Sequence, residues 1–198
     1  MTQIKREITR DDIMPVADYE KIRKANKQKL IAIKKDRRIA VGPFTTFYFE
    51  SYETMWAQIH EMLYIERGGE EQIADELTAY NPLIPNGSEL VATFMIEIDD
   101  PVRRDFTLRK LGGVEETVYI SINGEKSYAV PETEVDRTTE DGKTSAIHFL
   151  HFPLSASQKD QMRAKNTEVL MGIDHAEYGH MAKFNEENRN ALAADLST

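Results

Sequence analysis

The sequence predicts an α+β fold in which helices pack on an antiparallel sheet built from hairpins. One stretch, 117–130, alternates like two paired strands and turns at Asn123-Gly124, the pair that best tolerates a type I′ turn. A second hairpin is expected over 167–184. Helical patterns come early and late in the chain and do not alternate regularly with strands, which argues against a doubly wound sheet.

One domain is expected for the whole chain. Its 198 residues are 40% hydrophobic and 30% charged, which is enough for a core. No linker rich in Gly, Ser and Pro divides the chain, and no repeat of solenoid length is visible. We therefore predict a single domain over 1–198, with a mainly helical part over about 1–80 and a mixed part over about 81–198.

The N-terminal part should open with a helix that is preceded by a short turn. Thr9 and Asp12 form a capping-box pattern, and Pro15 suits the first turn of a helix that runs to about Lys35. Gly42-Pro43 then breaks an extended stretch, so that 44–50 is predicted to be a strand.

The clearest helix follows the strand and should end at Gly68-Gly69, where glycine can close a helix. Its predicted apolar face consists of Met55, Trp56, Ile59, Met62 and Leu63. A second helix is expected over about 70–79. A rigid loop then runs from Asn81-Pro82 to Gly87 and leads into a strand over 90–98.

Three further helices are predicted in the mixed part. One begins at Pro101 and ends near Leu111 before Gly112-Gly113. The second follows a strand in 144–154 and starts from a capping box of Ser155 and Gln158. Asn185 caps the last helix, which ends near residue 196.

Cysteine is absent from the sequence, which limits the possible chemistry. The chain cannot form a disulfide, use a thiol nucleophile or hold an iron–sulfur cluster through thiolates, so any divalent metal would need His, Asp or Glu ligands. No apolar run approaches the ~18 residues that a membrane span needs, and the first residues are charged. We therefore expect a cytoplasmic protein without a membrane association.

Charge is unevenly distributed along the chain. The net charge of −9 argues against nucleic-acid binding by the whole surface. Residues 21–38, however, hold nine basic residues against one aspartate, so this stretch carries +8 and the rest of the chain carries −17. Lys34, Lys35, Arg37 and Arg38 are candidates for binding an anion or a partner. The alternative is that they form a solvated helix face.

Two histidines, His148 and His175, and one aspartate, Asp174, are candidate site residues. His148 and His151 have the spacing of a ligand pair, but residues three apart on a strand point to opposite faces. His175 lies near a predicted turn, where Asp174 could orient its imidazole or share a metal. The competing interpretations are a half-buried strand histidine for His148 and a polar turn for His175.

Two glutamates complete the candidate set. Glu66 falls in the middle of the apolar helix face, so it should be paired, bound to a metal, or directed to solvent at the helix end. Glu97 lies on the more polar face of its strand and either exits to solvent or enters a pocket walled by the loop 81–86. Glu66, Glu97, His148 and His175 are thus the catalytic candidates, and together with Asp174 they are the metal-ligand candidates.

Several sequence blocks resemble an uncharacterised bacterial family of about this length, described only as a domain of unknown function. The blocks include "RRIAVGPFTTFYFE", "ELTAYNPLIPNGSELVATFMIEIDDP", "KTSAIHFLHF" and "GIDHAEY". The motif positions that match are Arg38, Glu61, Glu66, Asn81, Pro82, Glu97, Thr144, His148, Asp174, His175 and Tyr178. His60 and His151 depart from the family pattern, which weakens any site built on them.

The resemblance implies a redox setting, because genes of the family often lie near rubrerythrin and a heterodisulfide-reductase-like iron–sulfur protein. Nucleotide-binding, nucleophile-elbow and zinc-protease strings are absent from the sequence. The leading hypothesis is therefore a non-catalytic accessory protein of a rubrerythrin or iron–sulfur redox partner. One alternative is an enzyme or sensor with a His/carboxylate site for iron, manganese or zinc. The other is anion or nucleic-acid binding through the basic helix.

Overall fold

The computed structural model describes residues 5–132, 139 and 142–197. Its helices are α1 (Val16–Lys35), α2 (Tyr52–Glu66), α3 (Gly69–Tyr80), α4 (Pro101–Lys110), α5 (Ala156–Arg163) and α6 (Glu186–Ala193). Three 3₁₀ turns accompany them: η1 (Arg10–Asp12), η2 (Asn81–Leu83) and η3 (Val114–Thr117). The strands are β1 (Arg38–Val41), β2 (Thr45–Phe49), β3 (Glu89–Ile96), β4 (Val118–Ile122), β5 (Glu125–Tyr128), β6 (Val130–Pro131), β7 (Ile147–Pro153), β8 (Val169–His175) and β9 (Tyr178–Lys183).

The strands form two antiparallel sheets, which confirms the predicted α+β class. Sheet A has the order β1-β2-β3-β7-β6, and sheet B has the order β5-β4-β8-β9. Both predicted hairpins are present, as β4–β5 and β8–β9. Asn123 and Gly124 have φ values of 48° and 89°, as a type I′ turn requires. Sheet A also contains β1 and β2, and β2 corresponds to the strand predicted over 44–50.

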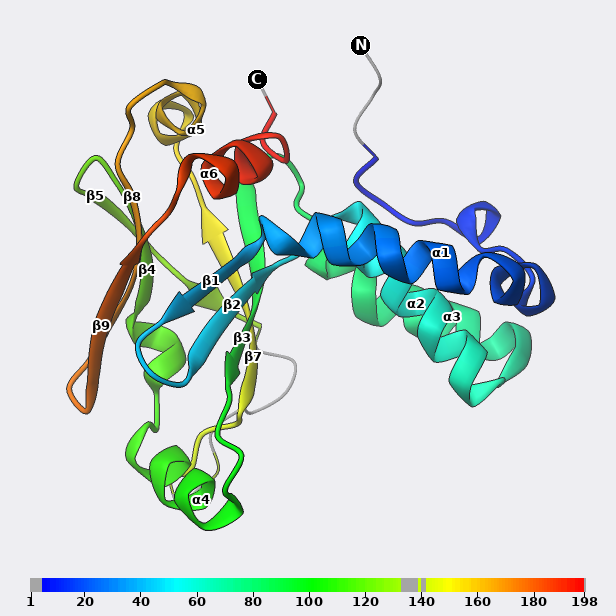
Figure 1. Ribbon diagram of the computed structural model, residues 1–198, viewed down its shortest axis with the longest axis horizontal. Helices are drawn as coiled ribbons and strands as arrows, with labels where there is room; N and C mark the ends of the chain where they lie inside the picture. The colour runs from blue at the N-terminus through cyan, green and yellow to red at the C-terminus, as the bar shows by residue number, and fades with distance from the viewer. Residues whose placement is uncertain (1–4, 133–138, 140–141, 198) are drawn as a thin grey trace.

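The two sheets face each other and form a β-sandwich around the main core (Figure 1). On β3, Leu90, Ala92, Phe94 and Ile96 point into this core, as the alternating pattern predicted. Phe94 stacks on Phe47 of β2 with ring centroids 4.6 Å apart, and both are fully buried. Tyr178 of β9 ties the sheets together, because its hydroxyl donates to the carbonyl oxygen of Val41.

Helices α1, α2 and α3 form an arm that projects from the outer face of sheet A (Figure 1). A smaller apolar cluster holds this helical arm together and includes Ile13, Ile59, Leu63 and Ile73. The arm meets the sheet where Val91 and Phe149 join the same cluster. In the part of the chain that the structure describes, no helix is long and apolar enough to cross a membrane.

Local sequence signals explain most helix boundaries, with one exception. The capping boxes at Thr9, Ser155 and Asn185 are present. The prediction that Gly68-Gly69 closes α2 was wrong in detail, because Arg67 takes the left-handed conformation with φ 54°. Gly69 instead begins α3 with φ 80°.

Candidate functional site

A cavity of about 450 Å³ lies between the outer face of sheet A and the helical arm. We call it the sheet–arm cavity. Four of its lining side chains are charged and several are apolar: Lys34, Arg38, Glu50 and Glu97, with Met55, Met95 and Phe149 among the others. The volume and the mixture of apolar walls with a few polar groups are typical of small-molecule sites. Tyr80 and Leu83 also line the cavity, so Leu83 is the residue of the predicted loop wall 81–86 that is found among the lining side chains.

Glu97 lies at the mouth of this cavity and is held by two hydroxyl groups. Thr46 donates to Oε2 and Tyr48 donates to Oε1, each at 2.7 Å. The Arg38 guanidinium lies 5.1 Å from the centre of the Tyr48 ring. Glu97 therefore orients Tyr48, and the Tyr48 ring supports the Arg38 cation at the mouth.

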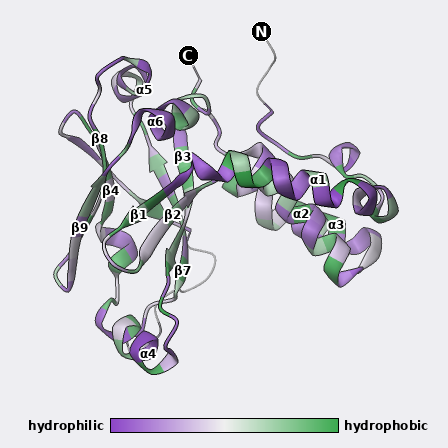
Figure 2. Cartoon of the chain, viewed as in Figure 1, coloured by the Kyte–Doolittle hydropathy of each residue, from purple (hydrophilic) through white to green (hydrophobic). Residues whose placement is uncertain are grey.

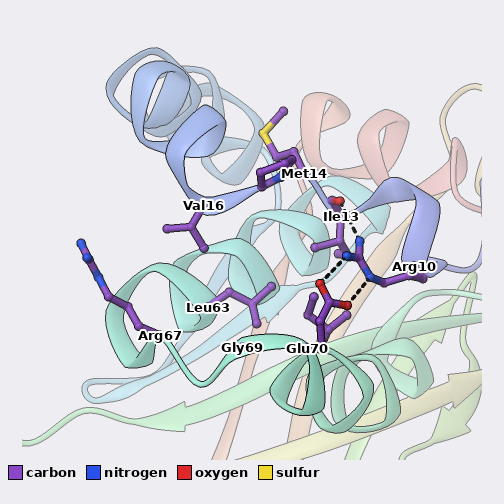
Figure 3. Close-up of a pocket in the computed structure, with 10 residues that line it drawn as sticks. Arg10, Ile13, Met14, Val16, Leu63, Arg67, Gly69 and Glu70 are labelled. Atoms are coloured by element: carbon purple, nitrogen blue, oxygen red, sulfur yellow. Dashed lines mark hydrogen bonds and ion pairs between the residues drawn. The ribbon is translucent and has the colours of Figure 1, made fainter.

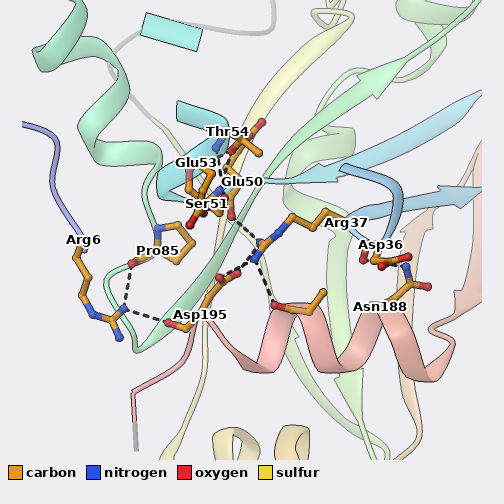
Figure 4. A network of polar contacts seen from close by, with 11 residues as sticks. Arg6, Asp36, Arg37, Glu50, Ser51, Glu53, Thr54, Pro85, Asn188 and Asp195 are labelled. Atoms are coloured by element: carbon orange, nitrogen blue, oxygen red, sulfur yellow. Dashed lines mark hydrogen bonds and ion pairs between the residues drawn. The ribbon is translucent and has the colours of Figure 1, made fainter. Parts of the chain in front are cut away.

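Glu50 lies deeper in the cavity, only 7% exposed, and two hydroxyl groups hold it as well. Thr93 donates to Oε1 at 2.7 Å and Thr54 donates to Oε2 at 2.6 Å. Thr93 stands on β3 and Thr54 on α2, so the carboxylate links the sheet to the arm. Figure 4 shows Glu50 beside Thr54. The alternation of β2 brings Tyr48 and Glu50 to one face of sheet A.

Arg37 faces away from the cavity into a buried polar network (Figure 4). Its guanidinium makes a bidentate ion pair with Asp195, at 2.7 and 2.8 Å. It also donates to the main-chain oxygens of Glu50 and Ala191. The side chain of Arg37 therefore holds the C-terminal segment beside β1. Of the two neighbouring arginines, Arg38 is the one that lines the cavity.

The outward face of α1 is a second candidate site. Ile31 is 71% exposed, and helix geometry surrounds it with Lys24, Lys27, Lys34 and Lys35. We call these five residues the α1 basic surface. Lys27 pairs with Glu61, whereas Lys24, Lys34 and Lys35 form no ion pair with the residues that the structure describes. Figure 2 shows that hydrophilic residues predominate along α1.

Glu61 fastens α1 to α2 from the opposite side of the helix. Its carboxylate accepts hydrogen bonds from Arg23 and from the hydroxyl of Tyr19, all at 2.8 Å. The bond to Arg23 is the main reason why the pKa of Glu61 falls to about 2. Burial, together with the bond to Glu61, raises the pKa of Tyr19 to about 12. Glu61, one of the positions that match the family pattern, therefore attaches α1 to α2.

The five predicted metal ligands lie in separate places. Glu66 is exposed at the end of α2 and accepts a bond from Gln72, so it escapes to solvent. Asp174 pairs with Lys126 at 2.6 Å, while the ring of His175 reaches Gly112. No group of three or more His, Asp or Glu side chains within the described ranges is placed to hold a metal ion.

His148 is fully buried on the core side of β7, where it meets Glu115 and Thr144. Its Nε2 lies 3.0 Å from the Thr144 hydroxyl, and its Nδ1 lies 3.9 Å from a carboxylate oxygen of Glu115. His151 lies on the opposite face of the strand, as the three-residue spacing predicted. The two histidines therefore belong to different environments.

His60, in the helical arm, and His151, on sheet A, have pKa values that shift in opposite directions. His60 is 2% exposed; its Nδ1 donates to Trp56 O and its Nε2 accepts from the main-chain N–H of Met14. Burial lowers the pKa of His60. His151 lies 3.1 Å from Glu89, and this hydrogen bond raises the pKa of His151.

A further cavity of about 410 Å³ opens at the end of the arm, between the segment before α1 and the α2–α3 turn (Figure 3). Ile13, Val16 and Leu63 line it, and the ion pair of Arg10 with Glu70 at 2.7 Å crosses its edge. Both partners of this pair are exposed, so the pair contributes little stability.

Sequence reasoning missed Glu50, Tyr48 and Thr93 as site residues. The signal that could have found them is the polar face shared by two strands: Thr46, Tyr48 and Glu50 alternate on one, and Thr93 and Glu97 on the other. Their convergence depends on the pairing of β2 with β3, which sets Tyr48 opposite Thr93.

The fold and the site define a class: a two-sheet α+β protein with a helical arm and a cavity of small-molecule size beneath it. The chain belongs to the family described as "Protein of unknown function (DUF3501)", whose model matches residues 7–196. It is also similar to the crystal structure of a protein of unknown function from Burkholderia pseudomallei K96243. The two share 36% identity with a TM-score of 0.89, over 96% of this chain and 99% of that one. Comparison with curated proteins gave no match.

Proposed function

We propose that this protein is a non-catalytic cytoplasmic accessory protein that docks an acidic partner protein through the α1 basic surface. The partner we propose is rubrerythrin or a heterodisulfide-reductase-like iron–sulfur protein, in peroxide- or iron-linked metabolism of a bacterium. The observation that carries the proposal is the exposure of Ile31 within a group of lysines on an otherwise acidic chain.

The contacts of α1 support this role. Of its 20 residues only Tyr19 is buried, and the helix attaches to α2 mainly through Tyr19, Arg23 and Lys27 bound to Glu61. Its opposite face is left to solvent. An apolar side chain among exposed lysines suits an acidic surface with an apolar centre, because charge steers the encounter and burial of the isoleucine adds affinity.

The test is direct binding of purified rubrerythrin and of the iron–sulfur protein from the same genome, measured at low and at moderate salt. We expect binding that weakens as salt rises, because exposed charges are screened. Ile31→Asp should weaken it by roughly tenfold or more. Met181→Asp is the matched control, since Met181 is 64% exposed on β9 and far from α1 in the chain.

Charge reversal provides a second arm of the same test. Lys35→Glu should reduce the association rate several-fold, while Lys165→Glu, an exposed lysine outside α1, should not. Absence of binding to both proteins would contradict the proposal. Tighter binding to a mixed-sequence DNA duplex than to either protein would replace it with nucleic-acid binding.

A second candidate function is a His/carboxylate metal enzyme or sensor. The buried pairing of His148 with Glu115 and Thr144 favours it, because a buried imidazole beside a carboxylate is common at functional sites. Elemental analysis of protein purified without a metal-affinity tag tests it. Stoichiometric iron, manganese or zinc that is lost in His148→Ala but kept in His175→Ala would support this alternative.

A further inference from the structure

The sheet–arm cavity is a different site from the α1 basic surface and shares only Lys34 with it. Its charged groups lie at different depths: the carboxylate of Glu50 lies deep in the cavity, and the basic side chains of Arg38 and Lys34 lie nearer the mouth. The fourth charged group, the carboxylate of Glu97, is also at the mouth, where the hydroxyl groups of Thr46 and Tyr48 donate to its two oxygens. The walls between them are mainly apolar and include Met55, Met95 and Phe149.

Glu50 is a buried carboxylate whose hydrogen bonds come from hydroxyl groups alone among the described residues. Arg37 binds the Asp195 carboxylate and the main-chain oxygen of Glu50, and not the Glu50 carboxylate. A carboxylate has about four lone-pair sites, and two hydroxyl donors leave acceptor capacity on both oxygens. A buried carboxylate is costly without a cationic partner, so a ligand cation would stabilise it.

Arg38 and Lys34 present the opposite charge. Neither forms an ion pair with any residue in the described part of the chain, and Arg38 is held over the Tyr48 ring that Glu97 orients. The planar guanidinium suits a carboxylate or phosphate oxygen pair. The mouth of the cavity is therefore prepared for an anionic group.

The spacing of the two charges fits one small molecule. Arg38 pairs with Tyr48 across the β1–β2 ladder, and Glu50 follows Tyr48 by two residues on the same face. Strand spacing and rise place the Cα atoms of Arg38 and Glu50 about 8 Å apart. Side chains of this length leave room between their charged ends for a compact ligand.

We propose that the sheet–arm cavity binds a small amphoteric molecule of the amino-acid class. Its protonated amine binds Glu50, its carboxylate binds Arg38 and Lys34, and its apolar body packs against Met55, Met95 and Phe149. Thr54 and Thr93 position the Glu50 carboxylate, and Tyr48 with Glu97 positions Arg38.

Calorimetric titration of the full-length chain with matched probes tests this assignment. The probes are L-phenylalanine and L-leucine, which carry both charges, phenethylamine, which carries only the amine, and 3-phenylpropionate, which carries only the acid. At least one of the two amino acids should bind roughly tenfold or more tightly than both single-charge probes. Equal affinity for all four probes, or no binding of either amino acid, would overturn the proposal.

Two variants separate the charges. Glu50→Gln keeps the shape: its amide oxygen accepts from one threonine hydroxyl and its NH2 group donates to the other. It should weaken amino-acid binding by roughly tenfold while leaving 3-phenylpropionate unchanged. Arg38→Gln, at an exposed position where folding is not at risk, should weaken amino-acid binding and leave phenethylamine unchanged. Glu66→Gln is the control, because Glu66 is exposed outside the cavity. Amino-acid binding that both cavity variants leave intact would also overturn the proposal.

Discussion

The β-sandwich and the helical arm are stabilised in different ways. The sandwich core consists of fully buried apolar side chains from both sheets, such as Phe47, Phe94 and Ile120. The arm has a smaller apolar cluster and depends more on specific polar contacts, among them those of Glu61. Apolar burial is non-directional and large in sum, whereas each polar contact adds only about 1 kcal/mol net.

This difference determines where the candidate sites can form. A helix fastened along one stripe leaves its other face free, and an arm that meets a sheet at an angle leaves a cavity beside the contact. Both the α1 basic surface and the sheet–arm cavity depend on the arm. The sandwich serves as the support for both.

The largest effect is expected in the sandwich core. Phe94→Ala removes a ring with no exposed surface that stacks on Phe47, and it should lower the free energy of unfolding by about 3–5 kcal/mol. Circular dichroism reports the whole fold, while fluorescence of Trp56, the single tryptophan, reports the arm. Both signals should shift together, because the arm has no support once the sandwich unfolds.

Ile59→Ala is the matched change in the arm, since Ile59 is also fully buried. It should move the Trp56 transition to lower denaturant while the circular dichroism transition moves less. Identical shifts of both signals in this variant would show that the arm and the sandwich unfold as one unit.

The next largest effect is expected at the junction between the two regions. The side chains of Arg37 and Asp195 are 10% and 13% exposed. Arg37→Ala leaves the Asp195 carboxylate without its ion-pair partner in this nearly buried site. We expect a loss of about 3 kcal/mol in the free energy of unfolding. Arg38→Ala is the adjacent control and should change stability by less than about 0.5 kcal/mol, because its guanidinium is exposed.

The attachment of the N-terminal segment to the arm should contribute less. The Asn81 side chain accepts from the N–H of Ile8 and donates to its carbonyl oxygen, at 2.8 and 2.9 Å. Asn81→Ala should therefore cost about 1–3 kcal/mol, seen first in Trp56 fluorescence. Asn190→Ala, on the exposed side of α6, should be neutral. A similar loss in both variants would remove the special role of Asn81.

Local chemistry made much of this fold predictable. The capping boxes at Thr9 and Ser155 and the Asn123-Gly124 turn act within a few residues, so the sequence alone places them. The division into two sheets was not predictable in this way, because β3 pairs with β7 across a long stretch of chain and no short pattern encodes that partner.

The same distinction explains the candidate site. Glu97 was recognisable as a carboxylate on the polar face of its strand, and Lys34 and Arg38 as part of a basic stretch. Glu50 was not recognisable, because its hydrogen-bond donors are Thr54 on α2 and Thr93 on β3, and only the tertiary arrangement brings these together. The proposed clustering of Glu66 with Glu97 stays unsupported, since Glu66 bonds to Gln72 at the far end of α2.

The smallest effects are expected from pH, and they should have opposite signs in the two regions. The pKa of His60, in the arm, is lowered in the folded state, so the unfolded chain binds more protons as pH falls below about 6.5 and the arm loses stability there. The pKa of His151, in sheet A, is raised, so the contribution of His151 to stability is complete below about pH 6.5 and is lost as pH rises through the pKa of the folded state.

His60→Gln should abolish the acid-side fall of the Trp56 transition, and His151→Gln should abolish the alkaline-side fall of the circular dichroism transition. If either substitution flattens both sides, the two histidines report one cooperative unit and the separation of arm from sandwich fails.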